Sequence, residues 1–155
     1  MVRMKVLVSL LLSLVFFVST TAHAEPTLAL QKRLSSLKGQ VIYVDFWASW
    51  CGPCRKSFPW LNEMQANYGP QGLTVLSVNV DAKKSFALEF LEEFPANFDV
   101  IYDPKGKIAR SYDLRGMPSS FIVDRQGTVV ATHVGFNEQK KHQYETEIKN
   151  LLKQR

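Results

Sequence analysis

The chain has 155 residues, a formal net charge of +5 at pH 7 and 46% hydrophobic residues. Its 19 basic and 14 acidic residues are interspersed, which gives little support to a nucleic-acid-binding role. The length suffices for one domain that buries its own core, and no internal repeat or low-complexity stretch indicates a second domain.

The first 24 residues have the order of a secretory signal peptide. Two basic residues precede an apolar run over residues 6–18, and an A-x-A cleavage site ends at Ala24. The run is shorter than the roughly 20 residues that a membrane span needs. We therefore expect a signal peptide over residues 1–24, cleaved after Ala24, and a mature domain of residues 25–155 in the periplasm or another extracytoplasmic compartment. A retained membrane anchor is the alternative.

After this segment, the hydrophobic pattern predicts alternating helices and strands. The expected helices span residues 26–37, 52–68 and 107–112, together with one that Ser85 caps and Pro95 ends and a last one that Asn137 caps. The expected strands span residues 41–47, 73–80, 98–102, 119–123 and 128–134. In the helix between Ser85 and Pro95, we expect the side chains of Phe86, Phe90, Leu91 and Phe94 to face the core. This order predicts an α/β fold with a central, mainly parallel sheet, helices on both faces and a final antiparallel hairpin.

Two cysteines, Cys51 and Cys54, stand where a predicted strand ends and a helix begins. A disulfide between them closes a very short loop and stabilises the fold little, so redox chemistry is the better reason for the pair. The free N–H groups of a helix N-terminus favour the thiolate, and we expect the Cys51 pKa to lie below its usual value of roughly 8.5. Cys54 can reach back from the first helical turn. Gly52 is expected to permit the tight turn, and Pro53 suits the first turn of a helix.

A lone C-x-x-C pair is also compatible with half of a zinc site. A structural zinc ion takes four ligands, and after the expected signal the histidines are His133 and His142, at a spacing that is unusual for ligands. We therefore expect neither a metal nor another cofactor. A single histidine in a strand is more often structural than catalytic, so we assign His133 no role.

Residues 44–55, VDFWASWCGPCR, resemble the active-site segment of the thioredoxin superfamily. Pro59 stands where thioredoxins kink the same helix, and residues 116–121, GMPSSF, resemble the loop that carries the family's cis-proline. The closest resemblance is to the exported TlpA/ResA-like disulfide reductases. It includes a strand end like that at residues 78–81 and an extra helix–strand unit at about residues 83–102. The implied fold is the thioredoxin fold, with a central mixed sheet and this insertion.

Asp45 is a carboxylate inside an otherwise apolar strand. Burial there raises a carboxyl pKa, which suits proton exchange near neutral pH. The resemblance implies that Asp45 is the base that deprotonates Cys54, whereas a solvated aspartate on a strand edge is the alternative. Thioredoxins often place a lysine beside this aspartate, and the alignment puts Ser77 there, which leaves the details of proton transfer open.

The resemblance also implies a substrate-binding surface around the pair. Pro118 is the expected cis-proline, and backbone groups of Met117 are expected to hydrogen-bond an extended substrate segment. A trans proline that starts a strand is the alternative. Trp50 is expected to cover the cysteine pair and to offer apolar contact to the substrate, whereas Trp47 is expected in the core. Trp60 suits either core packing or a partner patch.

The predicted function is thiol–disulfide exchange by a monomer, in which Cys51 attacks, Cys54 resolves the mixed disulfide and Asp45 moves the proton. The Gly-Pro between the cysteines resembles reducing members of the family, so reduction of disulfides in exported proteins is favoured. The resemblance implies a membrane electron donor for re-reduction. Apocytochrome c is one substrate of the family, but its cytochrome-maturation branch shows a glutamate after the proline loop, where this chain has Ser119 and Ser120.

Two further functions are compatible with the same fold. Thioredoxin-like copper chaperones usually have three residues between their cysteines and a downstream histidine ligand, and the C-x-x-C spacing here argues against that function. Thiol peroxidases of the superfamily have a threonine three residues before the reactive cysteine, where this chain has Ala48.

Overall fold

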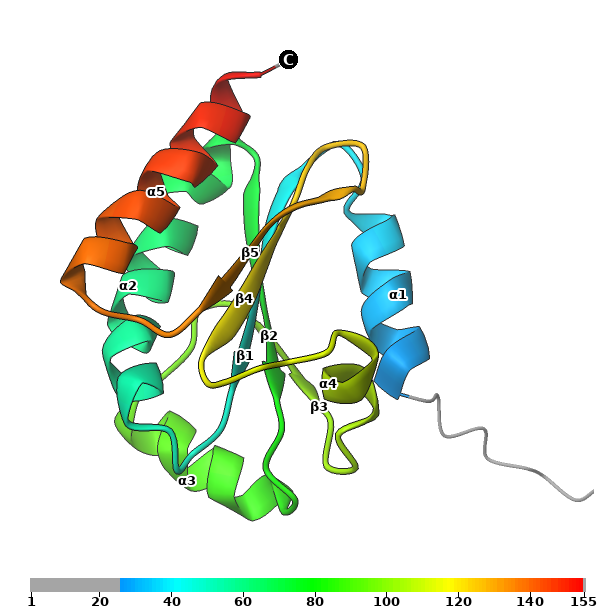
Figure 1. Cartoon of the computed structure of the whole chain (residues 1–155), viewed down its shortest axis with the longest axis vertical. Coiled ribbons are helices and arrows are strands. Elements are labelled where there is room, and N and C mark those ends of the chain that lie inside the picture. The colour runs from blue at the N-terminus through cyan, green and yellow to red at the C-terminus, as the bar shows by residue number, and fades with distance from the viewer. Residues whose placement is uncertain (1–25, 155) are drawn as a thin grey trace, which may run out of the picture.

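The computed structural model describes residues 26–154, which form a five-stranded sheet with helices on both faces (Figure 1). The helices are α1 (Pro26–Ser36), α2 (Gly52–Tyr68), α3 (Lys84–Glu93), α4 (Lys107–Ser111) and α5 (Glu138–Lys153), with a short 3₁₀ helix at Gly69–Gln71. The strands are β1 (Val41–Trp47), β2 (Leu73–Asn79), β3 (Asp99–Tyr102), β4 (Ser119–Val123) and β5 (Val129–Val134). The predicted order of elements is confirmed, and the expected signal peptide lies outside the described residues. Within residues 26–154, no helix has the length and apolar character to span a membrane.

The sheet has the strand order β3-β2-β1-β4-β5. Strands β1, β2 and β3 run parallel, and β4 runs antiparallel to both β1 and β5. The predicted mixed sheet with a final hairpin is therefore confirmed. All seven residues of the central strand β1 are buried, which explains its dense apolar run. The expected extra helix–strand unit corresponds to α3 and the edge strand β3.

Helices α2 and α5 cover one face of the sheet, and α1 and α4 cover the other (Figure 1). Because successive side chains of a strand point to opposite faces, β1 contributes to both layers. Tyr43 and Trp47 enter the hydrophobic cluster on the α2–α5 face, whereas Val44 and Phe46 enter the cluster on the α1–α4 face. Asp45 alternates with Val44 and Phe46, so its carboxyl lies on the α2–α5 face.

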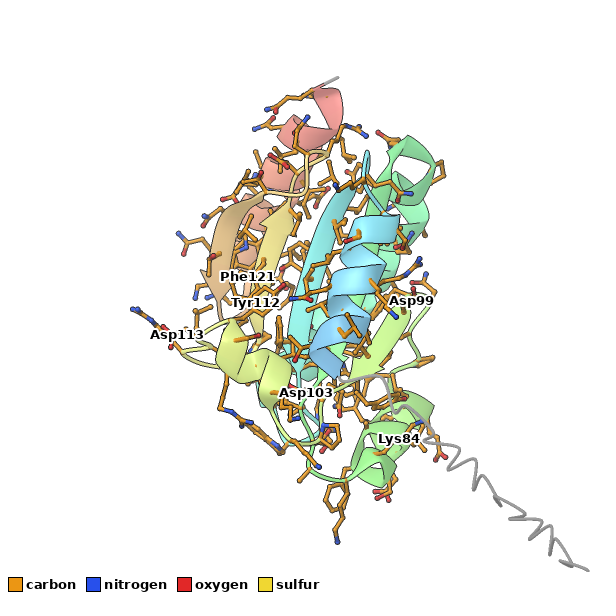
Figure 2. All side chains as sticks on the ribbon, turned by 90° about the vertical axis from the view of Figure 1, so that its right-hand side faces the viewer. Lys84, Asp99, Asp103, Tyr112, Asp113 and Phe121 are labelled. Carbon is orange, nitrogen blue, oxygen red and sulfur yellow. A yellow bond between two sulfur atoms is a disulfide. The ribbon has the colours of Figure 1, made fainter. Side chains whose placement is uncertain are left out.

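The α1–α4 face is closed by aromatic packing and by one aspartate (Figure 2). The ring of Tyr112, which follows α4, packs against that of Phe121 in β4 with their centroids 4.9 Å apart. The carboxylate of Asp103 accepts hydrogen bonds from the backbone N–H groups of Lys107 (2.8 Å) and Ala109 (2.9 Å). These bonds satisfy otherwise free donors in the first turn of α4.

At the end of the sheet opposite the β1–α2 junction, the Arg125 guanidinium in the β4–β5 turn joins three segments. It donates to the backbone carbonyls of Gly39 (2.7 Å), Leu152 (3.2 Å) and Gln154 (3.1 Å). One side chain therefore links the β4–β5 turn, the α1–β1 turn and the end of α5 by hydrogen bonds.

Two predictions about helix α3 are wrong. Its N-cap is Lys83, with no capping side-chain hydrogen bond among the described residues, and Ser85 lies inside the first turn. Phe86 is 44% exposed rather than inward, whereas Ala87 and Phe90 are buried. The physical reason is position, because α3 lies at one end of the sheet (Figure 1) and buries a narrower stripe than a helix lying across a sheet face.

The predicted cap of the last helix is confirmed. Helix α5 has Asn137 as its N-cap, and the Asn137 side chain accepts a hydrogen bond from the Lys140 N–H at 2.9 Å. This bond satisfies one of the free donors at the start of the helix.

Candidate active site

The cysteine pair lies at the junction of β1 and α2, and its sulfurs form a disulfide. Cys51 is the N-cap of α2, and the Cys54 backbone N–H donates a hydrogen bond to the Cys51 sulfur at 3.3 Å. Both residues are buried, Cys54 completely. In the reduced protein, this N–H and the positive end of the helix favour thiolate over thiol at Cys51. The Cys51 sulfur therefore lies at the N-terminus of α2, with Cys54 one helical turn behind it.

Gly52 and Pro53 occupy the first turn of α2. Pro53 stands at the start of the helix, as predicted, where a missing N–H costs little. The reason given for Gly52 is not supported, because its φ is not among the positive glycine φ values of the described chain. A Cβ added to Gly52 would meet no atom of the described residues within 4 Å. The local backbone therefore does not require glycine there.

The loop before the cysteines is held by Asp81, a residue of the strand end at 78–81 for which no role was predicted. Its buried carboxylate accepts hydrogen bonds from the Ser49 N–H (2.9 Å), the Ser49 hydroxyl (2.8 Å) and the Asn79 amide (2.7 Å). The Asp81 N–H in turn donates to Asn79 Oδ1 at 3.1 Å. This network ties the loop that carries Trp50 to the end of β2. The signal that could have found it is the Asn-x-Asp pattern directly after a buried strand.

Asp45 is 2% exposed, so the alternative of a solvated edge aspartate is wrong. Its Oδ2 atom has no hydrogen-bond partner among residues 26–154. Burial alone raises the Asp45 pKa well above its usual value, because a low-dielectric interior disfavours the charged carboxylate. In the register of β1 and β2, Asp45 lies opposite Ser77, whose hydroxyl accepts a hydrogen bond from the Trp47 indole N–H at 3.2 Å. A hydroxyl therefore occupies the position where thioredoxins often carry a lysine.

The Met117–Pro118 peptide bond is cis, as predicted, and the trans alternative is wrong. Strand β4 begins at the next residue, and Ser119 pairs with Phe46 near the end of β1. Pro118 therefore lies at the same end of the sheet as the β1–α2 junction. Met117 is half-buried against the hydrophobic cluster that contains both cysteines.

The three tryptophans divide between core and surface. Trp47 is fully buried, as predicted. Trp60 is also buried, with its ring centroid 5.5 Å from that of Tyr43, which decides for core packing. Trp50 is 69% exposed beside Cys51 and lines, with residues of α2 and α3, a surface groove of about 320 Å³. Trp50 is thus a large apolar side chain that the site presents to solvent.

Comparison with known proteins decides the family. A family model of redoxins matches residues 20–149. The chain belongs to the Redoxin family. It is 32% identical over 117 residues to the thiol-disulfide oxidoreductase ResA of Bacillus subtilis, which covers 75% of this chain and 65% of the relative.

Solved structures of similar sequence and fold agree with the assignment of this chain to the Redoxin family. A Chlorobium tepidum protein assigned as a thiol:disulfide interchange protein DsbE has 52% identity and a TM-score of 0.75, covering 77% of this chain and 84% of that one. An exposed lipoprotein thioredoxin of Streptococcus pneumoniae has 31% identity and a TM-score of 0.65, covering 76% and 90%. The predicted thioredoxin-like fold is confirmed. Thiol–disulfide oxidoreductase is the enzyme class that these relatives indicate, and the chain carries its C-x-x-C pair as a disulfide.

Proposed function

We propose that this protein is a thiol–disulfide oxidoreductase that reduces disulfides of exported proteins. The observation that carries the proposal is the position of Cys51 at the N-cap of α2, where its sulfur accepts the Cys54 N–H, with Cys54 buried behind it. The signal-like order of residues 1–24 supports an extracytoplasmic location, such as the periplasm, for a mature domain of residues 25–155. The pneumococcal relative is an exposed lipoprotein thioredoxin, which agrees with that location.

The first step is attack by the Cys51 thiolate on a substrate disulfide. Its sulfur forms a bond to one substrate sulfur while the substrate S–S bond breaks, and the second substrate sulfur leaves as a thiolate that takes a proton. The product is a mixed disulfide between Cys51 and the substrate. The N-terminal end of α2 lowers the cost of the negative charge on Cys51 before the attack.

The second step releases the substrate. The Cys54 thiol gives its proton to the Asp45 carboxylate, and the Cys54 thiolate attacks the Cys51 sulfur. The Cys51–Cys54 disulfide forms, and the substrate sulfur that was bonded to Cys51 leaves as a thiolate that takes a proton from solvent. Two electrons have then passed from the cysteine pair to the substrate. The raised pKa of the buried Asp45 carboxyl supports this role, because it makes the group a better proton acceptor near neutral pH.

We propose that Trp50, Met117 and Pro118 bind the substrate around the sulfurs. The exposed Trp50 ring offers apolar contact, and backbone groups of Met117 beside the cis-proline pair with an extended substrate segment. Gly52 and Pro53 complete the loop between the cysteines. Re-reduction of the pair requires a donor of two electrons and two protons, for which a membrane electron donor is the proposal, and the protein works as a monomer.

The test of this function is a trapping experiment. In Cys54→Ser, attack by Cys51 proceeds but release is blocked, so mixed disulfides with exported proteins accumulate in the cell. They are detected as adducts that a reductant removes. The purified wild type is expected to reduce insulin disulfides. Apocytochrome c among the trapped proteins would identify cytochrome maturation as a task.

The matched control is Cys51→Ser, which keeps one cysteine but loses the N-cap sulfur, and which is expected to form far fewer adducts. Equal trapping by the two variants would contradict the assignment of Cys51 as the attacking sulfur. Absence of adducts with Cys54→Ser, together with no insulin reduction by the wild type, would refute the proposed function.

A further inference from the structure

Three buried polar residues form one row across neighbouring strands. In the strand registers, Asp45 of β1 pairs with Ser120 of β4, and Ser120 pairs with His133 of β5. Their exposed fractions are 2%, 3% and 8%. Directly opposite residues of antiparallel strands share a face, with Cβ atoms about 4.5–5.5 Å apart. The row therefore runs from the buried carboxyl of the active site to the edge of the sheet, on the α2–α5 face.

Hydrogen bonds extend the row to the surface. The His133 Nε2 atom lies 2.7 Å from an oxygen of Glu147 in α5, and its Nδ1 atom lies 3.4 Å from the Ser120 hydroxyl. The Ser120 hydroxyl also pairs with the Tyr43 hydroxyl at 2.6 Å. The ring of Tyr144 stacks on His133 with their centroids 3.9 Å apart, which fixes the imidazole plane. His133 is thus bonded on both ring nitrogens.

The outer end of the row is open to solvent. The Glu147 side chain is 34% exposed, and with His133 it lines a surface groove of about 450 Å³ between β5 and α5. The residues that line this groove include none from the start of α2, where Cys51 is found. A substrate held in a mixed disulfide covers the cysteine end and leaves this groove free. The row of strand partners Asp45, Ser120 and His133 is then the candidate route for a proton that must leave Asp45 during release.

We propose that Ser120, His133 and Glu147 conduct the proton between Asp45 and solvent. The proposal deepens the proposed function and rests on the assignment of Asp45 as the proton acceptor. Asp45 accepts the Cys54 proton and passes a proton to the Ser120 hydroxyl. Ser120 delivers its own proton to His133 Nδ1, and His133 releases the Nε2 proton to Glu147 and water. No electron moves along the row, and each group regains its starting proton count when the cycle closes.

Neighbouring groups agree with this route. Around the imidazole, α5 contributes the Glu147 carboxylate and the Tyr144 ring, β4 contributes the Ser120 hydroxyl, and β1 contributes Tyr43 through Ser120. Within the part of the chain that the structure describes, the Oδ2 atom of Asp45 has no hydrogen-bond partner. A serine hydroxyl both donates and accepts, so Ser120 can relay a proton to this carboxyl.

The test measures proton exchange at Asp45 without turnover. In the oxidised full-length protein, the sulfurs of the disulfide carry no proton, so the cysteine pair exchanges none with Asp45. The proposal then requires that exchange between Asp45 and solvent depends on the row. After a rapid pH jump, time-resolved infrared spectroscopy follows the carbonyl band of the protonated Asp45 carboxyl, which is assigned by its loss in Asp45→Asn. This readout does not depend on disulfide reductase activity.

Two variants break the row at different links, and each has a matched control. His133→Ala is compared with His142→Ala, in which an α5 histidine outside the row is removed. Ser120→Ala is compared with Ser119→Ala, in which the neighbouring buried hydroxyl, bonded to the Gly116 carbonyl, is lost. We expect exchange at Asp45 to slow about a hundredfold in the first member of each pair, the lower end of what a positioned acid–base group contributes. We expect each control to stay within about twofold of the wild type.

Chemical rescue separates a proton route from a packing effect. Removal of the His133 ring enlarges the groove that this residue lines, so added imidazole is expected to restore exchange in His133→Ala but not in Ser120→Ala. A folded Ser120→Ala protein with the wild-type exchange rate would overturn the proposal, even if His133→Ala fails to fold. Slow exchange that imidazole leaves unchanged in a folded His133→Ala protein would also overturn it. Insulin reduction by the wild type tests the proposed function separately.

Discussion

Replacing Asp45 by Asn removes a buried carboxyl that titrates differently in the folded and unfolded chains. Burial raises the Asp45 pKa in the folded protein, so the native state keeps the proton over a pH range in which the unfolded chain has already lost it. The native state then binds more protons than the unfolded state, and the free energy of unfolding falls as pH rises through this range. The full contribution is present below the unfolded carboxyl pKa of about 4 and is lost as pH rises through the folded pKa. The Asp45→Asn variant does not suffer this loss.

The structure sets the size of the effect. Asp45 is almost fully buried, and its Oδ2 atom is unpaired within residues 26–154, a situation that costs about 1–3 kcal/mol for a buried polar group. We expect the stability of oxidised Asp45→Asn relative to oxidised wild type to increase between pH 4 and pH 8, because only the wild type loses the contribution of the protonated carboxyl. Each pKa unit between the folded and unfolded carboxyl corresponds to about 1.36 kcal/mol. The measured increase therefore reports the folded-state pKa.

Urea unfolding of the oxidised proteins at several pH values between 4 and 8 makes this measurement. The matched control is Asp113→Asn, because the Asp113 side chain is 90% exposed, and its stability difference from the wild type should not vary with pH. A gap between Asp45→Asn and the wild type that stays constant with pH would refute a raised pKa at Asp45. A gap that narrows as pH rises would show that the folded protein stabilises the carboxylate.

Three further predictions concern the surroundings of the cysteine pair. Asp81→Ala leaves the Ser49 N–H without its partner, so we expect a loss of about 3 kcal/mol in urea unfolding and slower insulin reduction; unchanged values of both would contradict the anchoring role. Trp50→Ala is expected to lower kcat/KM for insulin while leaving urea unfolding within about 0.5 kcal/mol of the wild type, because the side chain is exposed. Phe58→Ala should cost about 3–5 kcal/mol in the same unfolding assay, since Phe58 is fully buried against Trp47, and a cost below 1 kcal/mol would count against this packing.

Much of the fold could be predicted because its signals are local. The apolar run of β1 and the Asn137 cap each depend on residues close together in the chain, and both are confirmed. Burial of Asp45 followed from the same reasoning, since a strand with apolar residues on both sides of the aspartate is covered on both faces.

The predictions that were wrong, or were not made, depend on distant contacts. Exposure of Phe86 is set by how α3 meets the end of the sheet, which a helical period does not reveal. The anchoring of Ser49 by Asp81 joins residues 32 positions apart. The row through Ser120 and His133 needs the registers of two strand pairs, so a histidine that looked merely structural in the sequence gained a hypothesis only when its neighbours were placed.

The hydrogen bonds of Arg125 lie at the end of the sheet opposite the cysteine pair. Bonds between sulfur atoms are made and broken at one end of the sheet, whereas the opposite end is fastened by hydrogen bonds from one guanidinium to backbone carbonyls, which do not change with oxidation state. One end of the sheet thus carries the redox reaction, and the contacts at the other end do not depend on the redox state. The end of α5 is held by Arg125. A fluorophore or solid support attached there therefore leaves the cysteine end accessible to substrates.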